Sequence, residues 1–154
     1  MIIELSKLYN LISKTRNRQT TILVTGVFDL LHPAHIKFLK LSKNQGDILL
    51  VGLETDTRVK KLKGKNRPVE NLETRLNNIS KLSFVDYVFA LPEKFNTKKD
   101  FDNFIAEIKP NVLAVSSHTP NLTIKKELIE KHGGQLNIVM IEDPQVSTTK
   151  ILEK

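Results

Sequence analysis

The sequence predicts an α/β fold, with one five-stranded parallel sheet that carries helices on both faces. Short aliphatic and β-branched runs of strand length alternate with longer segments whose apolar residues recur at helical spacing. This alternation favours strands joined by crossover helices, and such strands are parallel. No repeat, low-complexity stretch or linker interrupts it, so residues 1–154 are expected to form one domain. Ligands bind such sheets beyond the carboxyl ends of the strands, near a topological switch point.

The elements of the N-terminal half follow from local spacing and from helix and strand boundaries. Leu5, Leu8 and Ile12 fall on one face of a helix, so the chain is expected to begin with an amphipathic helix. Pro33 suits a first helical position, where no N–H is needed, and Gly46 suits the end of that helix. The expected elements, in order, are a leading helix within 1–18, a strand at 20–26, a helix at 33–43, a strand at 47–53 and a helix at 71–82.

The C-terminal half continues the alternation. Phe101, Phe104 and Ile108 recur at helical spacing, and Gly133 with Gly134 marks the end of a later helix. The expected strands are 85–91, 111–115 and 136–141, and the expected helices are 100–108, 121–132 and 147–154.

Composition and charge limit the classes of function. Hydrophobic residues make up 40% and charged residues 27% of the chain, which is typical of a soluble globular protein. The absence of cysteine excludes a disulfide framework, a thiolate metal site and a cysteine nucleophile, and it suits the cytoplasm. No signal peptide or membrane span is expected. The net charge of +7 favours anionic partners. The aromatic content of 6%, with no visible stacking platform, disfavours nucleic acid among them.

Two histidines form the first candidate site. His32 and His35 lie three residues apart at the start of the expected helix 33–43, so their imidazoles share one face beside backbone N–H groups that attract anions. Together with the turn that follows Gly26, they form a candidate phosphate cradle in which imidazoles donate hydrogen bonds to growing negative charge. The alternative is that His32 caps the helix and His35 packs locally.

A basic segment forms the second candidate site. Six of the ten residues at 58–67 are lysine or arginine. Such a run is usually a solvated loop. The functional alternative is a mobile flap that brings lysines onto phosphates, with Lys63 first among them and Lys60 or Lys61 beside it.

The residues Gly26, Phe28, Asp29, His32 and His35 resemble the Gly-x-Phe-Asp-x-x-His-x-Gly-His motif of the cytidylyltransferase-like nucleotidyltransferases. The chain departs from that motif at Ala34, where the family has glycine. The resemblance implies a Rossmann-like domain in which His32 and His35 stabilise the transferred phosphate. It also implies that Gly26, Val27, Phe28 and Asp29 bind the nucleotide.

Two further segments extend the resemblance. Residues 59–68 are similar to the Val-Lys-x-Leu-Lys-Gly-x-x-Arg-Pro segment of the adenylyltransferase half of ADP-heptose synthase, and archaeal FAD synthetase has a similar segment. This implies catalytic use of Lys63. Arg75, in Glu73-Thr74-Arg75, resembles a family arginine that supports the triphosphate, although an ordinary arginine on a helix surface is the equal alternative.

The C-terminal motif resembles a phosphate-binding end. Ser147, Thr148 and Thr149 look like part of the Ile-Ser-Thr-Thr-Lys-Ile end of glycerol-3-phosphate cytidylyltransferase, which implies that they bind nucleotide phosphates at a helix N-terminus. Gln145 and Glu142 replace a glycine and an arginine of that enzyme. The likeness therefore supports phosphate binding better than cytidine binding.

One departure bears on the acceptor. The Gly-Gly-Asp that follows the fourth strand in the ADP-heptose synthase family is Ser116-Ser117-His118 here. Ser117 and His118, with Lys60 and Lys61, are therefore the candidates for the acceptor pocket.

The predicted function is transfer of a nucleoside monophosphate, AMP favoured, from a nucleoside triphosphate to a phosphorylated small molecule such as a sugar phosphate, with release of pyrophosphate. Mg²⁺ is expected with the triphosphate, and no protein metal ligand is assigned. The alternatives are a cytidylyltransferase acting on a polyol phosphate and a non-catalytic nucleotide sensor. The apolar stripe of the leading helix either forms a homodimer contact or covers the sheet.

Overall fold

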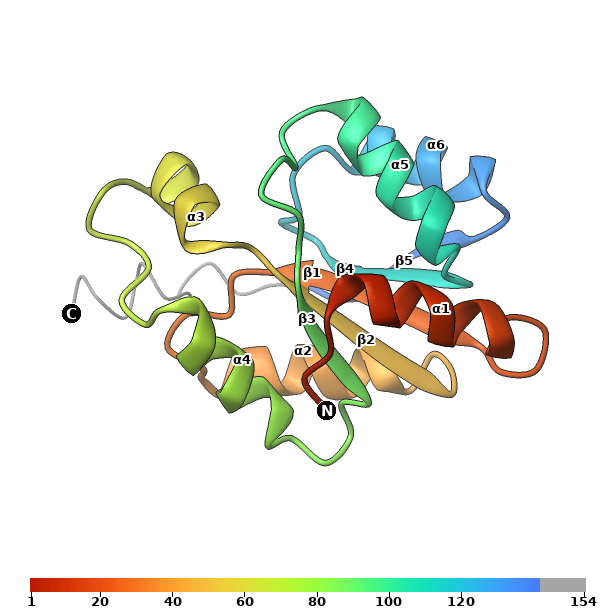
Figure 1. Ribbon diagram of the computed structural model, residues 1–154, viewed down its shortest axis with the longest axis horizontal. Helices are drawn as coiled ribbons and strands as arrows, with labels where there is room; N and C mark the ends of the chain where they lie inside the picture. Colours follow the sequence, from red (N-terminus) through yellow and green to blue (C-terminus); the bar gives the residue numbers. More distant parts are fainter. Residues whose placement is uncertain (142–154) are drawn as a thin grey trace.

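The computed structural model describes residues 1–141, which form one parallel sheet between two layers of helices (Figure 1). The helices are α1 (Leu5–Thr15), α2 (Pro33–Lys43), α3 (Asp56–Lys63), α4 (Leu72–Ser80), α5 (Lys98–Ile108) and α6 (Leu122–Lys131). The strands are β1 (Thr21–Gly26), β2 (Ile48–Leu53), β3 (Tyr87–Ala90), β4 (Val112–Ser116) and β5 (Gln135–Met140). The predicted fold class is therefore confirmed. The helix predicted at 147–154 lies outside the described residues.

The order of the strands creates a topological switch point. The sheet runs β3-β2-β1-β4-β5 with every pair parallel, so the chain winds from β1 toward one edge and then returns to wind toward the other. The reversal lies between β1 and β4. In doubly wound sheets a crevice opens at this point because the two neighbouring connections leave in opposite directions.

Two apolar clusters fix the helices to the sheet. Helices α1, α5 and α6 cover one face, and α2 and α4 cover the other (Figure 1). Leu8 and Ile12 of α1 are buried in the first cluster against strand residues such as Leu50. The apolar stripe of the leading helix therefore covers the sheet, which is one of the two outcomes that its sequence left open. Within residues 1–141, no helix has the length and apolar character needed to cross a bilayer.

Residues 58–63 of the basic segment belong to helix α3, so the loop expected there is wrong for this part of the segment. Thr55 caps α3 by accepting a hydrogen bond from the Arg58 N–H at 3.4 Å. The helix ends at Lys63, and Gly64 follows as its C-cap with a φ of 104°, which favours glycine. Among its apolar residues only Val59 is buried, so the segment lacks the periodic stripe by which helices are usually identified.

A buried arginine connects α4 to the carboxyl ends of β1 and β2. Arg75 is fully buried. Its Nη1 donates to the carbonyl oxygens of Val27 at 3.0 Å and Glu54 at 2.9 Å, and its Nη2 donates to Asp56 Oδ1 at 2.6 Å. Its Nε donates to the Glu70 carbonyl at 3.0 Å. The alternative of an ordinary surface arginine is therefore wrong. Arg75 joins α4 and the residue before its N-cap to the segments that follow β1 and β2.

We expect Arg75→Met to lower the free energy of unfolding by about 3–5 kcal/mol, because it leaves buried oxygen atoms without a donor. Chemical denaturation followed by circular dichroism measures the change. Arg75→Lys should restore only part of the loss, because an ammonium group cannot span the same four acceptors. Arg18→Met, at an exposed arginine, is the matched control, and an equal effect at both positions would contradict the assignment.

Candidate active site

The first cavity lies where β1 and β4 separate. The ladder between these strands contains only the pairs Ile22–Val112 and Leu23–Leu113, whereas β1 stays paired with β2 as far as Gly26. Beyond the last pair, the ends of the two strands line a cavity of about 210 Å³. Its walls come from the ends of β1, β4 and β5, the turns that follow β1 and β4, and α2. Single residues of α3, the loop after α3 and α6 complete them. The cavity therefore lies at the switch point, where the sequence predicted that a ligand would bind.

The turn after β1 brings the two histidines together in this cavity. Phe28 and Leu30 adopt positive φ angles of 51° and 53°, which few non-glycine residues do, and they turn the chain sharply into α2. His32 precedes the helix with extended backbone, and Pro33 opens it. The imidazole rings of His32 and His35 stack with their centroids 3.6 Å apart and their planes 20° apart. Both rings line the cavity, as their spacing in the sequence predicted.

The hydrogen bonding of His35 determines which of its ring atoms can donate. The backbone N–H of His32 donates to His35 Nδ1 at 3.4 Å. Because Nδ1 is the acceptor, the neutral imidazole carries its hydrogen on Nε2. Burial, together with the electrostatic effects of His32 and Lys63, lowers the pKa of His35 from 6.5 to about 3, and Asp29 opposes this shift. At neutral pH His35 is therefore an uncharged hydrogen-bond donor, suited to a phosphate oxygen.

Aromatic packing holds the ring of His35 in place. Phe28 contacts it edge-on at a centroid distance of 5.3 Å, and Phe28 also stacks on Phe38 at 6.5 Å. A Cβ atom on Gly26 would lie 2.9 Å from Cε2 of Phe28, so the ring occupies the space that glycine leaves. Gly26 and Phe28, predicted to bind nucleotide, thus line the cavity and also support the histidine.

Asp29 fastens the loop after α3 to the turn after β1. Its side chain is 1% exposed, and its carboxylate accepts hydrogen bonds from the N–H groups of Val69 at 2.7 Å and Glu70 at 2.9 Å. Arg67 Nε lies 3.4 Å from the same carboxylate and lines the cavity. Asp29, which was predicted to bind the nucleotide, lies in the cavity wall. It also positions Arg67, which the sequence did not indicate as a site residue.

The basic segment contributes two of its cations to the cavity. Lys63, the last residue of α3, lines the cavity together with Arg67. Lys60 and Lys61 are exposed and do not line it, because they lie farther from the end of the helix that faces the histidines. Arg67 is part of the Lys-Gly-x-x-Arg-Pro segment, so the sequence motif contained this residue as well as the lysines.

The remaining predicted site residues fall in different places. Ser117 and His118 do not line the cavity, whereas their neighbours Ser116 and Thr119 do. The turn after β4 brings these two neighbours together, and the Ser116 N–H donates to Thr119 Oγ1 at 3.2 Å. Arg75 lies behind the turn, outside the cavity lining. Ser147, Thr148 and Thr149 lie outside the described residues. Lys125 of α6 is a further lining residue, which nothing in the sequence motifs indicated.

Comparisons with known proteins give matches over most of the chain. The model of the cytidylyltransferase-like family matches residues 23–154. The chain is 36% identical over 134 residues to the bifunctional protein HldE of Pelobacter propionicus, a match that covers 86% of this chain and 26% of that protein. It is 33% identical over 155 residues to the same-named protein of Histophilus somni, with coverage of 99% and 31%. The chain thus spans about a third or less of these curated relatives.

Two solved structures are also similar to this chain. The lipopolysaccharide core biosynthesis protein of Thermoplasma volcanium is 31% identical, with a TM-score of 0.65 over 81% of this chain and 98% of that one. The pantoate-beta-alanine ligase of Francisella tularensis has a TM-score of 0.71 over 99% of this chain and 75% of its own, but only 14% identity, so it supports the fold alone.

The titration of His35 tests the geometry of the site. NMR titration should give His35 a pKa far below its usual 6.5, near 3, and adding a nucleoside triphosphate should raise it, because a nearby anion favours the protonated ring. The His35→Gln variant identifies the signal.

The same titration predicts how stability depends on pH. The pKa of His35 is lower in the folded protein than in the unfolded chain, so between pH 6.5 and about 3 the unfolded chain binds more protons than the folded protein. The free energy of unfolding should therefore fall as the pH falls through that window. This pH dependence should be shallower in His35→Gln. Equal slopes for the two proteins would contradict a buried, neutral His35.

Proposed function

Because the chain belongs to the cytidylyltransferase-like family, we propose that it transfers a nucleoside monophosphate, AMP in preference to CMP, from a nucleoside triphosphate to a phosphorylated small molecule and releases pyrophosphate. The observation that carries this proposal is the stacked pair of His32 and His35 in a cavity at the switch point, with Lys63 and Arg67 in its wall. The neutral imidazole of His35 and the cations Lys63 and Arg67 face one cavity. This arrangement suits an α-phosphate, whose negative charge grows during the reaction.

The reaction needs little from the protein beyond alignment and charge stabilisation. A phosphate monoester is already anionic near neutral pH, so its oxygen attacks the α-phosphorus without a general base and without a covalent enzyme intermediate. His35 Nε2, with His32 beside it, would donate to a non-bridging oxygen of the α-phosphate. Lys63 and Arg67 would neutralise the charge that spreads over the phosphates. Ser147 to Thr149 would hold the outer phosphates, as their resemblance implies.

Mg²⁺ enters the proposal as an ion carried by the triphosphate. Magnesium commonly takes phosphate oxygens and water with few protein ligands. The cavity wall fits that arrangement, because its carboxylate, Asp29, already accepts from two backbone N–H groups. In the part of the chain that the structure describes, no three histidine, aspartate or glutamate side chains gather as metal ligands would.

The preference for AMP rests on resemblance. The likeness to the adenylyltransferase half of ADP-heptose synthase extends over more of the sequence than the likeness to glycerol-3-phosphate cytidylyltransferase. Gln145 and Glu142 also replace residues of the cytidylyltransferase motif. Pyrophosphate release measured with ATP and with CTP, each offered with a panel of sugar and polyol phosphates, separates the two reactions.

A nucleotide sensor without catalysis is the second candidate. One observation favours it: Ala34 lines the cavity, so a methyl group stands where the family motif has glycine. If the methyl group crowds a bound nucleotide, Ala34→Gly should tighten nucleotide binding measured by calorimetry. Nucleotide binding without pyrophosphate release across the whole acceptor panel would favour the sensor over the transferase.

Replacement of His35 tests the proposed role in transfer. We expect His35→Ala to lower turnover by about a hundredfold or more, because a donor to the transition state is lost, while the melting temperature shows that the fold survives. Lys37→Ala, at an exposed position on the same helix, should leave turnover unchanged. Near-normal turnover of the His35→Ala protein would defeat the assignment.

A further inference from the structure

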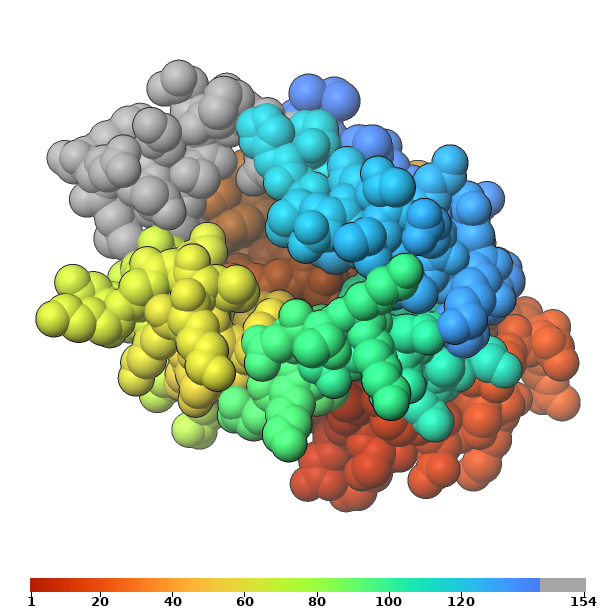
Figure 2. Space-filling model, turned by 90° about the horizontal axis from the view of Figure 1, so that it is seen from above, coloured from red at the N-terminus to blue at the C-terminus, as the bar shows by residue number. Residues whose placement is uncertain are grey.

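A second cavity adjoins the first. Thr25 and Lys125 line both cavities, so these two residues mark the boundary between them. The second cavity has a volume of about 510 Å³, and small-molecule sites typically have about 300–1,000 Å³. It lies between α3, the segment that leads from β3 into α5, and the start of α6. Figure 2 shows this region as a hollow bordered by the yellow residues of α3, the green residues that lead into α5 and the cyan and blue residues of α6.

Among the cations that the described residues place around this cavity, Lys125 is the one that makes no ion pair. Arg58 Nε lies 3.2 Å from the carboxylate of Glu54, and Lys98 Nζ lies 3.8 Å from that of Glu127, so both cations are already paired. Lys125 differs from them. Within residues 1–141, its ammonium group makes no hydrogen bond and no ion pair. The second cavity therefore offers its positive charge at the boundary, next to the cavity of the histidines.

The surroundings of Lys125 favour an anionic ligand. The side chain is half-buried, and burial lowers its pKa, while the carboxylate of Glu54 opposes the shift. A partly desolvated ammonium group without a partner is unfavourable, and an anion that contacts it restores the lost stabilisation. A phosphate group at this boundary would lie between Lys125 and the phosphate cradle.

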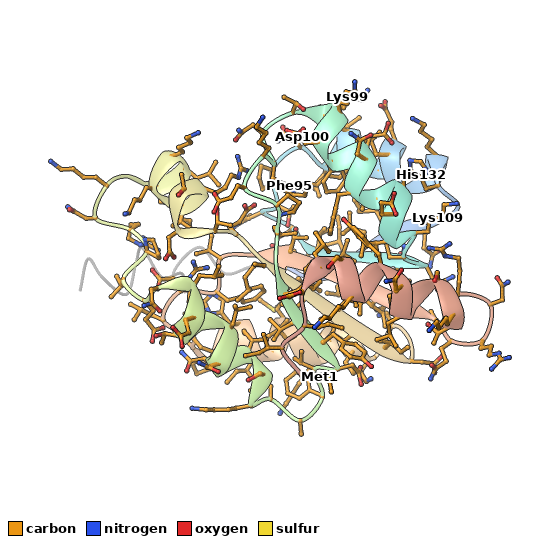
Figure 3. All side chains as sticks on the ribbon, viewed as in Figure 1. Met1, Phe95, Lys99, Asp100, Lys109 and His132 are labelled. Atoms are coloured by element: carbon orange, nitrogen blue, oxygen red, sulfur yellow. The ribbon has the colours of Figure 1, made fainter. Side chains whose placement is uncertain are left out.

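The rest of the second cavity suits a body that carries no charge of its own. Asn121 offers its amide group for hydroxyls, and Asn96, whose Oδ1 already accepts a hydrogen bond from Arg58 Nη1, offers its NH₂ group. The ring of Phe95 offers an apolar surface for the C–H groups of a sugar. Phe95 lies on the segment between β3 and α5, near the start of α5 (Figure 3). It is held there by Phe101 at a centroid distance of 5.8 Å and by Phe104 at 5.3 Å. Such a wall is pre-organised for a compact, hydroxylated ligand.

We infer that the second cavity binds the body of a sugar or polyol monophosphate, and that Lys125 binds the phosphate of this acceptor beside the cavity of the histidines. The inference rests on the proposed nucleotidyl transfer. An oxygen of the acceptor phosphate forms a bond to the α-phosphorus of the triphosphate. The bond from that phosphorus to the oxygen bridging to the β-phosphorus breaks, and pyrophosphate leaves with the electron pair. Lys125 would reduce the repulsion between the two anions as they approach.

Calorimetry on the full chain tests the inference without requiring turnover. The protein is saturated with an ATP analogue that has a methylene group between the α- and β-phosphorus atoms. It is then titrated with glycerol 3-phosphate, ribose 5-phosphate and mannose 1-phosphate, and with the unphosphorylated parent compounds. At least one monophosphate should bind about tenfold or more tightly than its parent, and Lys125→Met should weaken its binding by about tenfold or more. Affinity for the nucleotide analogue should fall less than affinity for the monophosphate, because Lys63 and Arg67 also line the cavity of the histidines.

Neighbouring and conservative substitutions serve as controls. Lys126→Met removes an exposed lysine, 3.9 Å from Glu130, and should leave acceptor binding unchanged. Lys125→Arg keeps the positive charge and should retain most of the affinity. Phe95→Leu should weaken the monophosphate and its parent by the same factor, because it changes the wall without removing the cation. Circular dichroism confirms that each variant is folded.

The outcomes separate this inference from the proposed function. If the wild-type protein releases pyrophosphate but Lys125→Met binds the monophosphate as tightly as wild type, the second cavity is not the acceptor site and the transferase assignment stands. If no monophosphate binds more tightly than its parent, the inference is overturned as well. If acceptor binding depends on Lys125 but no nucleotide is ever transferred, the inference stands and the proposed function fails.

Discussion

The early separation of β1 from β4 is the constraint on which the rest of the site depends. These strands pair at only two positions, while β1 stays paired with β2 along its whole length. The sheet is therefore continuous at its base and split at its carboxyl edge, where the winding of the chain reverses. Because helices cover both faces of the sheet, that split is a recess with firm walls, and each segment that lines it is fixed by the core below.

Buried polar groups hold the loops around this recess in place of apolar packing. Arg75 joins the segments after β1 and β2 to α4, and Asp29 joins the turn after β1 to the loop after α3. Each is almost completely enclosed, so its hydrogen bonds compete little with water and depend strictly on geometry. The turn that leads into α2 and the loop that carries Arg67 are thus positioned by charged residues that themselves lie behind or within the wall.

The electrostatics of the two cavities differ in a way that suits two anionic groups meeting at one point. The first cavity combines the neutral imidazole of His35 with Lys63 and Arg67, while the second has paired charges and apolar surface. Lys125 lies between them. A boundary cation near partly desolvated space interacts strongly with both neighbouring phosphates, because the low local dielectric weakens screening. The proposed chemistry therefore relies on preorganised charge more than on proton transfer.

The sequence alone determined the alternation of strands and helices, the parallel sheet and the pairing of His32 with His35, because each of these follows from spacing along one element or from the order of elements. It also indicated a phosphate site at the end of the first strand. Only the tertiary structure decided that Arg75 is buried, that Arg67 and Lys125 face the cavities and that Lys60 and Lys61 do not. Those outcomes depend on how separate elements pack and on where each helix ends. The spacing of residues along a single segment determines neither of these.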